Sequence, residues 1–469
     1  MTHHRARGPL MTDETRVDID ARVFPSTARR GSQCGQIKLQ GVKAGELIEQ
    51  YGSPLYVIDE HETRTRARET REAFERAFGR HGAEVSVYYA SKAMLAVAIA
   101  EWVSEEGLGV DVATGGELAV ALAAGVDPSR IGVHGNNKSD AEIRRAVEAG
   151  VGSIVIDSPQ EIARVARAAE AANTRQPVFL RVNSGVHAST HSYLATSHED
   201  QKFGVPLVQA VALATEIRSY ASLDFRGLHC HIGSQIFATD GFAESARRLL
   251  SVYAELEAGG TVAELNLGGG FGIAYTSEEA EEAPEIGALA TLIADAVAAS
   301  CAEYGLNIPH MSFEPGRSII GPAGVTLYTV GTTKPVTLTE ADPQDEGAAE
   351  RLYVSVDGGM SDNARPALYD SVYVARIASR LSTAEPILTR VVGKHCEAGD
   401  VLIEREWLPG DVQPGDVLAV PATGAYCWAL SSNYNYVPRP PVVAVHNGAS
   451  RLIVRGQTEA DLVAQSVIS

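Results

Sequence analysis

From about residue 54 onward, short apolar runs alternate with longer stretches rich in alanine, glutamate and arginine. The short runs have the length and composition of strands, and the longer stretches are helical in character, as in 141–150. We expect eight strands, in the runs VSVYYA, GVDVA, IGVHG, SIVID, VFLRVN, FRGLHCHIG, ELNLGGG and MSFEPG. Eight parallel strands that alternate with helices close a barrel. The pattern therefore predicts an α/β barrel of the TIM type over residues 54–317.

After Arg317 the helical stretches thin out. Strand-like runs such as VTLYTVGTT, RLYVSVDGG, TRVVGKHC and GDVLAVP follow one another, separated by glycine, proline or aspartate turns. We therefore expect residues 318–469 to form an all-β domain, to which a strand-rich stretch at 36–53 adds its own strands. Residues 1–35 are polar and lack a sustained period, which predicts a poorly ordered leader.

Length and composition fit this two-domain scheme. The chain has 469 residues, of which 45% are hydrophobic and 21% charged, values typical of a soluble globular protein. A formal net charge of -19 disfavours nucleic acid and anionic membranes as partners. Five scattered cysteines without paired metal-ligand spacing indicate a reducing compartment, and we expect the cytoplasm. We recognise no apolar run long enough to span a membrane.

The active site of a parallel barrel lies at the carboxyl ends of its strands. Polar side chains and glycines follow most of the expected strands: Lys92, Asp111, His134, Asn136, Asn137, Arg181, Asn183, His231, Ser234, Gly268, Gly269, Gly270, Glu314, Gly316 and Arg317. No other set of positions in the sequence is so rich in chemically reactive types. We take these strand ends as the candidate site.

Lys92 directly follows an apolar strand, where a partly desolvated lysine can form a Schiff base with a carbonyl group. A lysine whose aliphatic stem reaches out to solvent is the structural alternative. The glycines at 268–270 let backbone N–H groups approach an anion, and Gly316 with Arg317 adds an amide and a bidentate phosphate partner. A triple glycine is equally typical of a simple turn.

Glu314 precedes Gly316 and Arg317, the expected anion ligands. Its carboxylate is suited to keep a pyridine nitrogen protonated, and a protonated ring is a strong electron sink. An ion pair with a neighbouring arginine is the alternative. The flat imidazole of His231 suits stacking on an aromatic ring. His229 lies two residues earlier on the same side of the strand, deeper in the barrel, and we expect it only to pack there.

Nine motifs, in this order, resemble the fold-type III pyridoxal-phosphate-dependent decarboxylases over nearly the whole chain from about residue 36. They are YYASKA, GVDVATGGEL, HGNNKS, GLHCHIGSQI, LNLGGGFGI, EPGRSIIGPAG, VDGGMSDNARPALY, KHCEAGD and GAYCWALSSNYNYVPRP. The resemblance implies an alanine-racemase-type barrel with a β domain and a homodimer with shared active sites. Pyridoxal 5'-phosphate is the implied cofactor.

The resemblance also implies roles for individual residues. Lys92 would bind the cofactor covalently, His231 would stack on its ring, and Glu314 would pair with its pyridine nitrogen. The implied phosphate ligands are Ser234, Gly269, Gly270, Gly316, Arg317 and Tyr426. Cys396 would donate a proton into the partner's site. The implied substrate ligands are Arg317, Arg365, Tyr369, Glu397 and Tyr426.

Within that family, HIGSQ, DNARPALY, CEAGD and the YNYVPRP ending resemble the subgroup that decarboxylates meso-diaminopimelate to lysine, rather than ornithine or arginine. Arg317 and Arg365 suit two carboxylates, and Glu397 suits the distal ammonium. The alternatives are a decarboxylase of a related diacid or carboxy-polyamine, and a non-catalytic regulatory homologue. A zinc-dependent barrel hydrolase is a third.

Single residues keep plainer alternatives. Tyr426 is also typical of a core aromatic, Arg365 of a turn ion pair, and Cys396 of a small buried hydrophobe. Three histidines, His187, His191 and His198, gather in one loop. Because they lack a helical ligand pattern with a carboxylate, we expect a mobile lid there and no bound metal.

Overall fold

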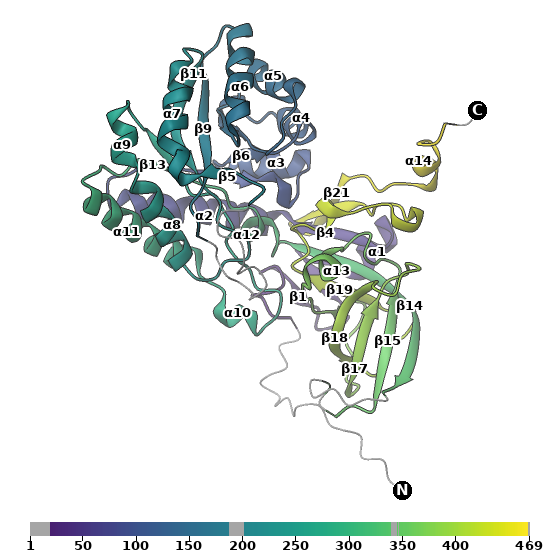
Figure 1. The fold of residues 1–469 in the computed structure, drawn as a ribbon. Helices are drawn as coiled ribbons and strands as arrows, with labels where there is room; N and C mark the ends of the chain where they lie inside the picture. Colours follow the sequence, from purple (N-terminus) through teal and green to yellow (C-terminus); the bar gives the residue numbers. More distant parts are fainter. Residues whose placement is uncertain (1–18, 187–200, 339–344, 346, 468–469) are drawn as a thin grey trace. The chain divides into compact units, whose positions relative to one another are not determined.

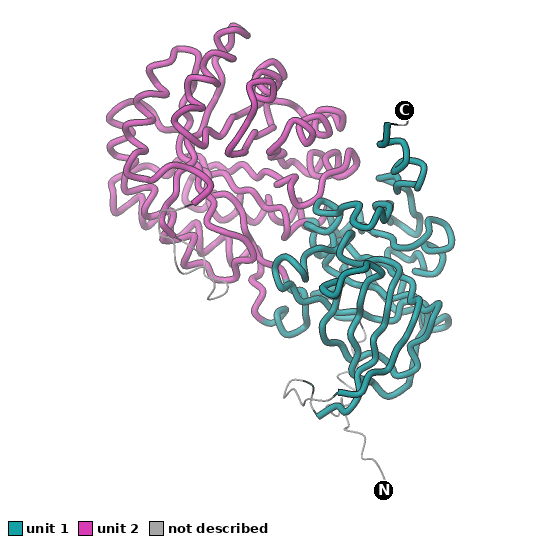
Figure 2. The backbone as a smooth tube through the Cα atoms, turned by 45° about the vertical axis from the view of Figure 1, so that its right-hand side comes forward, with its two compact units in different colours: residues 1–63, 274–281, 320–469 teal, residues 64–273, 282–319 magenta. Residues whose placement is uncertain are grey.

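The computed structural model describes residues 19–186, 201–338, 345 and 347–467. The chain divides into two compact units (Figure 2). One, the β unit, contains residues 1–63, 274–281 and 320–469, and the other, the barrel unit, contains residues 64–273 and 282–319.

The barrel unit is built on eight parallel strands that close on themselves. They are β5 (Val85–Ala90), β6 (Gly109–Val112), β7 (Ile131–Val133), β8 (Ser153–Ile156), β9 (Gln176–Asn183), β11 (Leu223–His229), β12 (Glu264–Asn266) and β13 (His310–Phe313). Each strand pairs with the next, and β13 pairs with β5. A two-residue strand, β10 (Val205–Pro206), pairs in parallel with the end of β9. The predicted eight-stranded barrel is thereby confirmed.

Helices follow the strands and cover the outside of the barrel (Figure 1). They are α2 (Glu60–Gly79), α3 (Val97–Glu105), α4 (Gly115–Ala123), α5 (Asp140–Ala149), α6 (Pro159–Ala171), α7 (Ala210–Ser219), α8 (Asp240–Leu250), α9 (Tyr253–Ala258) and α11 (Ile286–Tyr304). Helix α5 shows how the sequence sets the ends: Ser139 and Glu142 form a capping box, and Gly150 ends the helix in a left-handed conformation.

One outer helix corrects our expectation about apolar runs. The stretch from Glu279 to Tyr304 is long and apolar enough, by length and composition alone, to cross a membrane. Within it, α11 buries Leu289, Ile293 and Val297 on one face and packs against α8. The apolar composition therefore reflects an outer helix of the barrel, rich in alanine.

The β unit is organised around the long strand β14 (Gly324–Thr337). It pairs with β15 (Glu350–Val356), with β19 (Val417–Pro421) and with β4 (Leu55–Asp59). The sheet continues through β17 (Pro386–Val392), β18 (Val401–Pro409), β20 (Val442–His446) and β21 (Ala449–Val454), with β16 (Arg376–Ile377) beside β19.

A small sheet of β1 (Arg29–Arg30), β2 (Ile37–Leu39) and β3 (Val42–Lys43) adds to the β unit. The β unit also contains the short helices α1 (Ala44–Tyr51), α13 (Arg365–Tyr369) and α14 (Glu459–Val463). Two further helices, α10 (Glu279–Glu282) and α12 (Arg317–Ile320), contain the positions at which the chain passes between the two units. The unit is thus largely β, as expected, but not free of helix.

Two expected boundaries differ from the structure. Strand β4 pairs with β14 and β20, so residues 54–63 belong to the β unit and not to the barrel. All five residues of β4 are buried, which makes its sequence look like a barrel strand. Residues 19–35, expected to belong to a disordered leader, bury Phe24 and Ala28 in the core of the β unit.

Candidate active site

Backbone hydrogen bonds tie the carboxyl ends of three barrel strands together. Glu314, just after β13, donates its amide to the carbonyl of Gly268, which follows β12. Ala90, at the end of β5, donates its amide to the carbonyl of Pro315. A side chain at Gly269 would collide with the carbonyl of Glu314, so only glycine allows this approach. Lys92, Glu314 and the glycine run are thus held at one end of the barrel.

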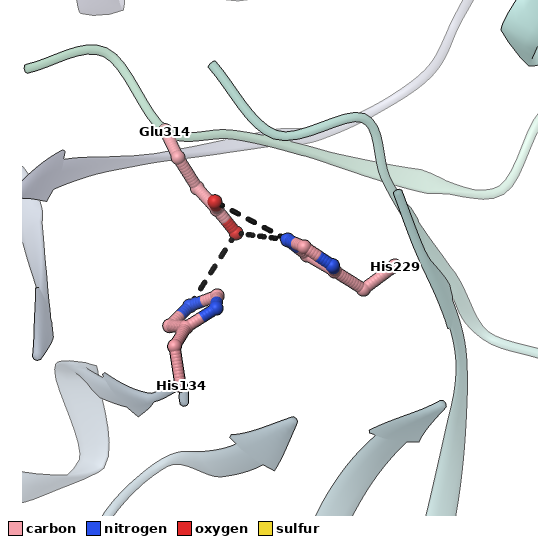
Figure 3. A group of neighbouring side chains, drawn as sticks. All are labelled: His134, His229 and Glu314. Atoms are coloured by element: carbon pink, nitrogen blue, oxygen red, sulfur yellow. Dashed lines mark hydrogen bonds and ion pairs between the residues drawn. The ribbon is translucent and has the colours of Figure 1, made fainter. Parts of the chain in front are cut away.

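Glu314 lies between two histidines at this end (Figure 3). The Nε2 atom of His229 is 3.0 Å from Oε1 and 3.2 Å from Oε2 of Glu314. The Nε2 atom of His134 is 3.5 Å from Oε1 and 3.2 Å from Oδ1 of Asp111. Glu314, His229 and Asp111 are buried. The cluster therefore places two imidazoles and two carboxyl groups at the carboxyl ends of four strands.

Burial sets the protonation states in this cluster. It lowers the pKa of both His134 and His229 to about 4, so both rings are neutral at pH 7. Burial works to raise the pKa of Glu314, but interactions with the two imidazoles outweigh it, and the pKa of this carboxyl lies below its usual range. Burial, and then the charge of Glu314, raise the pKa of Asp111 well above its usual range. Glu314 is therefore the carboxylate and Asp111 a neutral acid.

His229 corrects a sequence prediction. We expected it only to pack, but its ring is a polar partner of Glu314. The two-residue spacing from His231 correctly predicts the side of the strand on which His229 lies, but it does not predict that Glu314 is the partner of His229. His134 was recognised only as one polar residue among the strand ends. Its signal was its position after β7, the strand next but one to β5.

Lys92 lies in a short 3-10 helix (Ser91–Ala93) directly after β5. Ser91 and Ala93 are buried, but Lys92 itself is exposed, so the expected partial desolvation is absent in the single chain. The end of the strand carries this side chain out of the packed interior. Burial, and then the charge of Lys92, lower the pKa of His231 well below its ordinary value.

The predicted anion ligands of the barrel unit lie together. Arg317 donates from Nη2 to Oγ of Ser234 over 2.9 Å. The amide of Gly269 donates to Nδ1 of His231 over 3.3 Å. Gly270 has a φ of +108°, and a side chain there would collide with the carbonyl of Gly233. A hydroxyl, a guanidinium and closely approaching amides form a donor set that fits a phosphate group.

Gly316 belongs to the same arrangement. A Cβ atom there would lie 2.9 Å from the carbonyl oxygen of Ala90, which is closer than side chains pack. The backbone between Glu314 and Arg317 therefore runs directly against the end of β5. This contact brings the candidate pyridine partner and the candidate phosphate ligand to the strand that precedes Lys92.

The other predicted residues belong to the β unit: Arg365, Tyr369, Cys396, Glu397 and Tyr426. The guanidinium of Arg365 is buried, lies 4.7 Å from the ring centre of Tyr275, and donates to the hydroxyl of Tyr373 over 2.7 Å. Among the described residues its partners are aromatic, which disfavours the alternative of a turn ion pair.

Three of the four remaining side chains of this set are exposed in the single chain. Tyr369 is 63% exposed, and Cys396 and Glu397 are exposed too, so Cys396 is not a buried hydrophobe. Tyr426 is half-buried and has a φ of +61°, which a side chain rarely adopts. The loop histidines His187, His191 and His198 fall outside the described residues.

Comparisons with known proteins agree with this arrangement. The family model described as "Pyridoxal-dependent decarboxylase, pyridoxal binding domain" matches residues 64–321, which nearly coincide with the barrel unit. The fold and the strand-end groups thus define a pyridoxal-dependent decarboxylase.

Full-length relatives narrow the assignment. The diaminopimelate decarboxylase of Mycobacterium tuberculosis (strain H37Rv) is 46% identical over 95% of this chain and 98% of its own length. That of Bacillus subtilis is 43% identical over 94% and 97%. The solved diaminopimelate decarboxylase of M. jannaschii, in complex with L-lysine, has a TM-score of 0.83 at 30% identity and covers 94% of this chain and 98% of its own. The chain belongs to the diaminopimelate decarboxylase family.

Proposed function

We propose that this enzyme decarboxylates meso-2,6-diaminopimelate to L-lysine and carbon dioxide, the last step of lysine biosynthesis, with pyridoxal 5'-phosphate. The observation that carries the proposal is the Glu314 carboxylate, buried at the barrel mouth between two neutral imidazoles. The near full-length likeness to diaminopimelate decarboxylases supports the same reaction.

The bound cofactor supplies an aldehyde for the substrate amine and a ring that takes up the electron pair left by departing carbon dioxide. Lys92 would hold the cofactor through its aldehyde group until substrate binds. Glu314 would accept a hydrogen bond from the pyridinium N–H, and its depressed pKa keeps it an anion for that purpose. His231 would stack on the ring.

Phosphate binding falls to the donor set of the barrel unit and one tyrosine of the β unit. Ser234 and Arg317, already in contact, supply a hydroxyl and a guanidinium. Gly269, Gly270 and Gly316, where no side chain fits, would let the backbone approach the phosphate closely. Tyr426 would contribute its hydroxyl. This set neutralises the phosphate dianion locally in a chain whose net charge is -19.

Substrate recognition falls to Arg317, Arg365, Tyr369, Tyr426 and Glu397. The rings of Tyr275 and Tyr373 fix the guanidinium of Arg365, and a fixed planar guanidinium suits a carboxylate. Glu397 is exposed and meets the distal ammonium. An ornithine-type substrate has no distal carboxylate for Arg365, so this residue favours a diacid.

In the bond-breaking step, the bond between the α carbon and its carboxylate breaks and carbon dioxide leaves. The electron pair of the broken bond ends in a new C–H bond, which forms when the thiol of Cys396 donates its proton to the α carbon. The resulting thiolate regains a proton from water. Positioning, more than acidity, limits such a transfer, because the reacting atoms must meet at about 3–3.5 Å.

We infer that the enzyme works as a homodimer, in which Cys396 and Glu397 of one subunit complete the barrel site of the other. The exposure of both residues in the single chain supports this, as does the exposure of Leu368, Tyr369 and Tyr436 in the same unit. Mixing the Lys92→Ala variant with the strongly impaired Cys396→Ser variant should then restore up to about a quarter of the activity, through mixed dimers with one intact site. No recovery on mixing would contradict shared sites.

We also infer a cytoplasmic location. All five cysteines are free in the structure, and Cys34 and Cys396 are exposed, which suits a reducing compartment. Separation of cell fractions, with detection of the chain by antibody, tests the location.

The test of function combines a spectrum with a substrate panel. Purified protein with pyridoxal phosphate should absorb near roughly 420 nm, where lysine-bound cofactor absorbs. Carbon dioxide should be released from meso-diaminopimelate but not from lysine, ornithine or arginine. Turnover of a different diacid would favour the related-diacid alternative. A band with no turnover on any diacid would favour the regulatory homologue, and absence of the band would overturn the cofactor assignment.

A further inference from the structure

The loop between β17 and β18 carries Cys396 and Glu397 and is anchored at its base by a buried aspartate. Asp400 is 3% exposed. Its Oδ1 accepts the amide of Met360 over 2.6 Å, and its Oδ2 accepts both the amide and the Nδ1–H of His395 over 2.8 Å each. Three N–H donors on one buried carboxylate make charge-assisted bonds, which are about twice as strong as neutral ones. Asp400 thus joins the loop to the turn at Met360.

The space around this carboxylate leaves little freedom. A side chain at Gly393 would collide with the carboxylate of Asp400, and a Cβ at Gly359 would lie 2.6 Å from both the Asp400 oxygens and His395 Nδ1. The His395 ring is fully buried and stacks on Tyr434, with ring centres 5.5 Å apart and planes 6° from parallel. Its orientation is therefore set by a hydrogen bond at its edge and an aromatic ring on its face.

The segment that contains Tyr434 and Asn435 also forms hydrogen bonds with the loop, one of them at Cys396 itself. The amide of Cys396 donates to Oδ1 of Asn435 over 3.0 Å. Asn435 has a φ of +50°, a conformation that asparagine adopts more readily than most residues. The hydroxyl of neighbouring Tyr434 lies 3.5 Å from Oε2 of Glu397. The backbone on both sides of the thiol is therefore fixed, although the thiol is exposed.

We propose that Asp400, His395 and Asn435 are positioning residues, which hold the backbone at Cys396 so that its thiol delivers a proton to one carbon atom. The proposal rests on the proposed function, in which Cys396 is the proton donor. None of the three residues has to touch the substrate. An exposed thiol on a free loop would sample many positions, and a misplacement of about 1 Å costs roughly a hundredfold in rate.

The test is a double-mutant cycle. In Asp400→Asn, one carboxylate oxygen becomes an amide group that cannot accept its former donors, so the anchor is weakened. We expect kcat to fall about 10- to 100-fold, with KM changed less than about threefold. In a Cys396→Ser background the same substitution should lower kcat by less than about twofold, because the group that Asp400 positions is already gone. Equal losses in both backgrounds would overturn the proposal.

Asp416→Asn is the matched control. Asp416 is also a buried aspartate of the β unit; it accepts the amide of Gln413 and pairs with Arg380, on a turn that carries no candidate site residue. Its substitution should lower the denaturation midpoint and leave kcat within about twofold of the parent. His395→Asn, which retains a donor near Nδ1, should keep more activity than His395→Leu. Equal activities of these two variants would contradict the role of the His395–Asp400 bond.

A second readout separates this proposal from the proposed function. Cys34 is the other exposed cysteine, so a Cys34→Ser background leaves Cys396 as the reactive thiol. Asp400→Asn should speed alkylation of Cys396 by iodoacetamide at least about threefold, and Asp416→Asn should not. If the parent enzyme released no carbon dioxide from meso-diaminopimelate, the proposed function would fail while this comparison still tested the anchoring. Unchanged alkylation would overturn the anchoring.

Discussion

The Nε2 atom of His229 lies within 3.2 Å of both carboxylate oxygens of Glu314, so a single imidazole N–H faces the whole carboxylate. His134 approaches the Oε1 atom from another strand. Because burial keeps both rings neutral at pH 7, they do not cancel the negative charge, and His229 acts on the carboxylate as a hydrogen-bond donor. A carboxylate with this support stays ionised in a buried place, as a partner for a pyridinium requires.

Replacing His229 should weaken catalysis through Glu314. Removing one donor from a buried charged group costs roughly 1–3 kcal/mol, which corresponds to about a 5- to 150-fold loss in kcat/KM. His229→Gln, which retains an N–H donor, should lose less than His229→Ala. Steady-state kinetics of both variants, with circular dichroism as a check on folding, tests this, and equal kinetics for parent and His229→Ala would contradict it.

The same histidines should make stability depend on pH. Their folded pKa of about 4 lies below the unfolded value near 6.5, so the unfolded chain binds protons first as the pH falls. Their contribution is complete above about pH 6.5 and is lost between there and pH 4. From pH 7.5 to pH 5 each histidine should cost roughly 2 kcal/mol. Denaturant unfolding of the parent and of His229→Gln checks this: the variant should lose less stability over that interval, and an identical loss would contradict it.

Gly270→Ala should weaken cofactor binding. The new methyl group would meet the carbonyl of Gly233 at a φ of +108°, which distorts the backbone beside the phosphate ligands. We expect the affinity for pyridoxal phosphate, measured by absorbance titration, to fall at least about tenfold. Gly287→Ala is the control, because nothing lies within 4 Å of its Cβ position in α11. Equal affinities in the two variants would contradict a phosphate site at Gly270.

Arg365→Lys tests recognition of the diacid. Lysine retains the charge but loses the planar fork that Tyr275 and Tyr373 hold. We expect KM for meso-diaminopimelate to rise about tenfold, with a smaller change in kcat. Tyr369→Phe, which keeps the ring, should show a smaller effect on KM. An unchanged KM in Arg365→Lys would remove this residue from the substrate site.

Local sequence pattern predicted much of this fold, for a physical reason. Each barrel strand is a short apolar run followed by a polar strand end, and the barrel topology alone brings Lys92, Glu314 and the glycine run to one end. Strand β4 was misplaced because its five residues are all buried, as in a barrel strand, and periodicity does not tell which sheet a strand joins.

The polar partners were harder to predict. The contacts of His229 with Glu314, and of Cys396 with Asn435, join residues far apart in sequence, and no local pattern specifies them. The exposure of Lys92 also depends on how the strand end is packed, which composition does not reveal. The spacing of apolar residues therefore predicted the helices and strands, whereas only the structure showed which side chains contact one another within the site.

The most direct test of the central claim is the reaction run in deuterium oxide with meso-diaminopimelate and pyridoxal phosphate, with the lysine analysed by mass spectrometry. The proposed reaction predicts lysine that carries one non-exchangeable deuterium, at the carbon that lost carbon dioxide, in amounts equal to the gas released. Absence of lysine, or lysine without that deuterium, would contradict decarboxylation followed by protonation at that carbon.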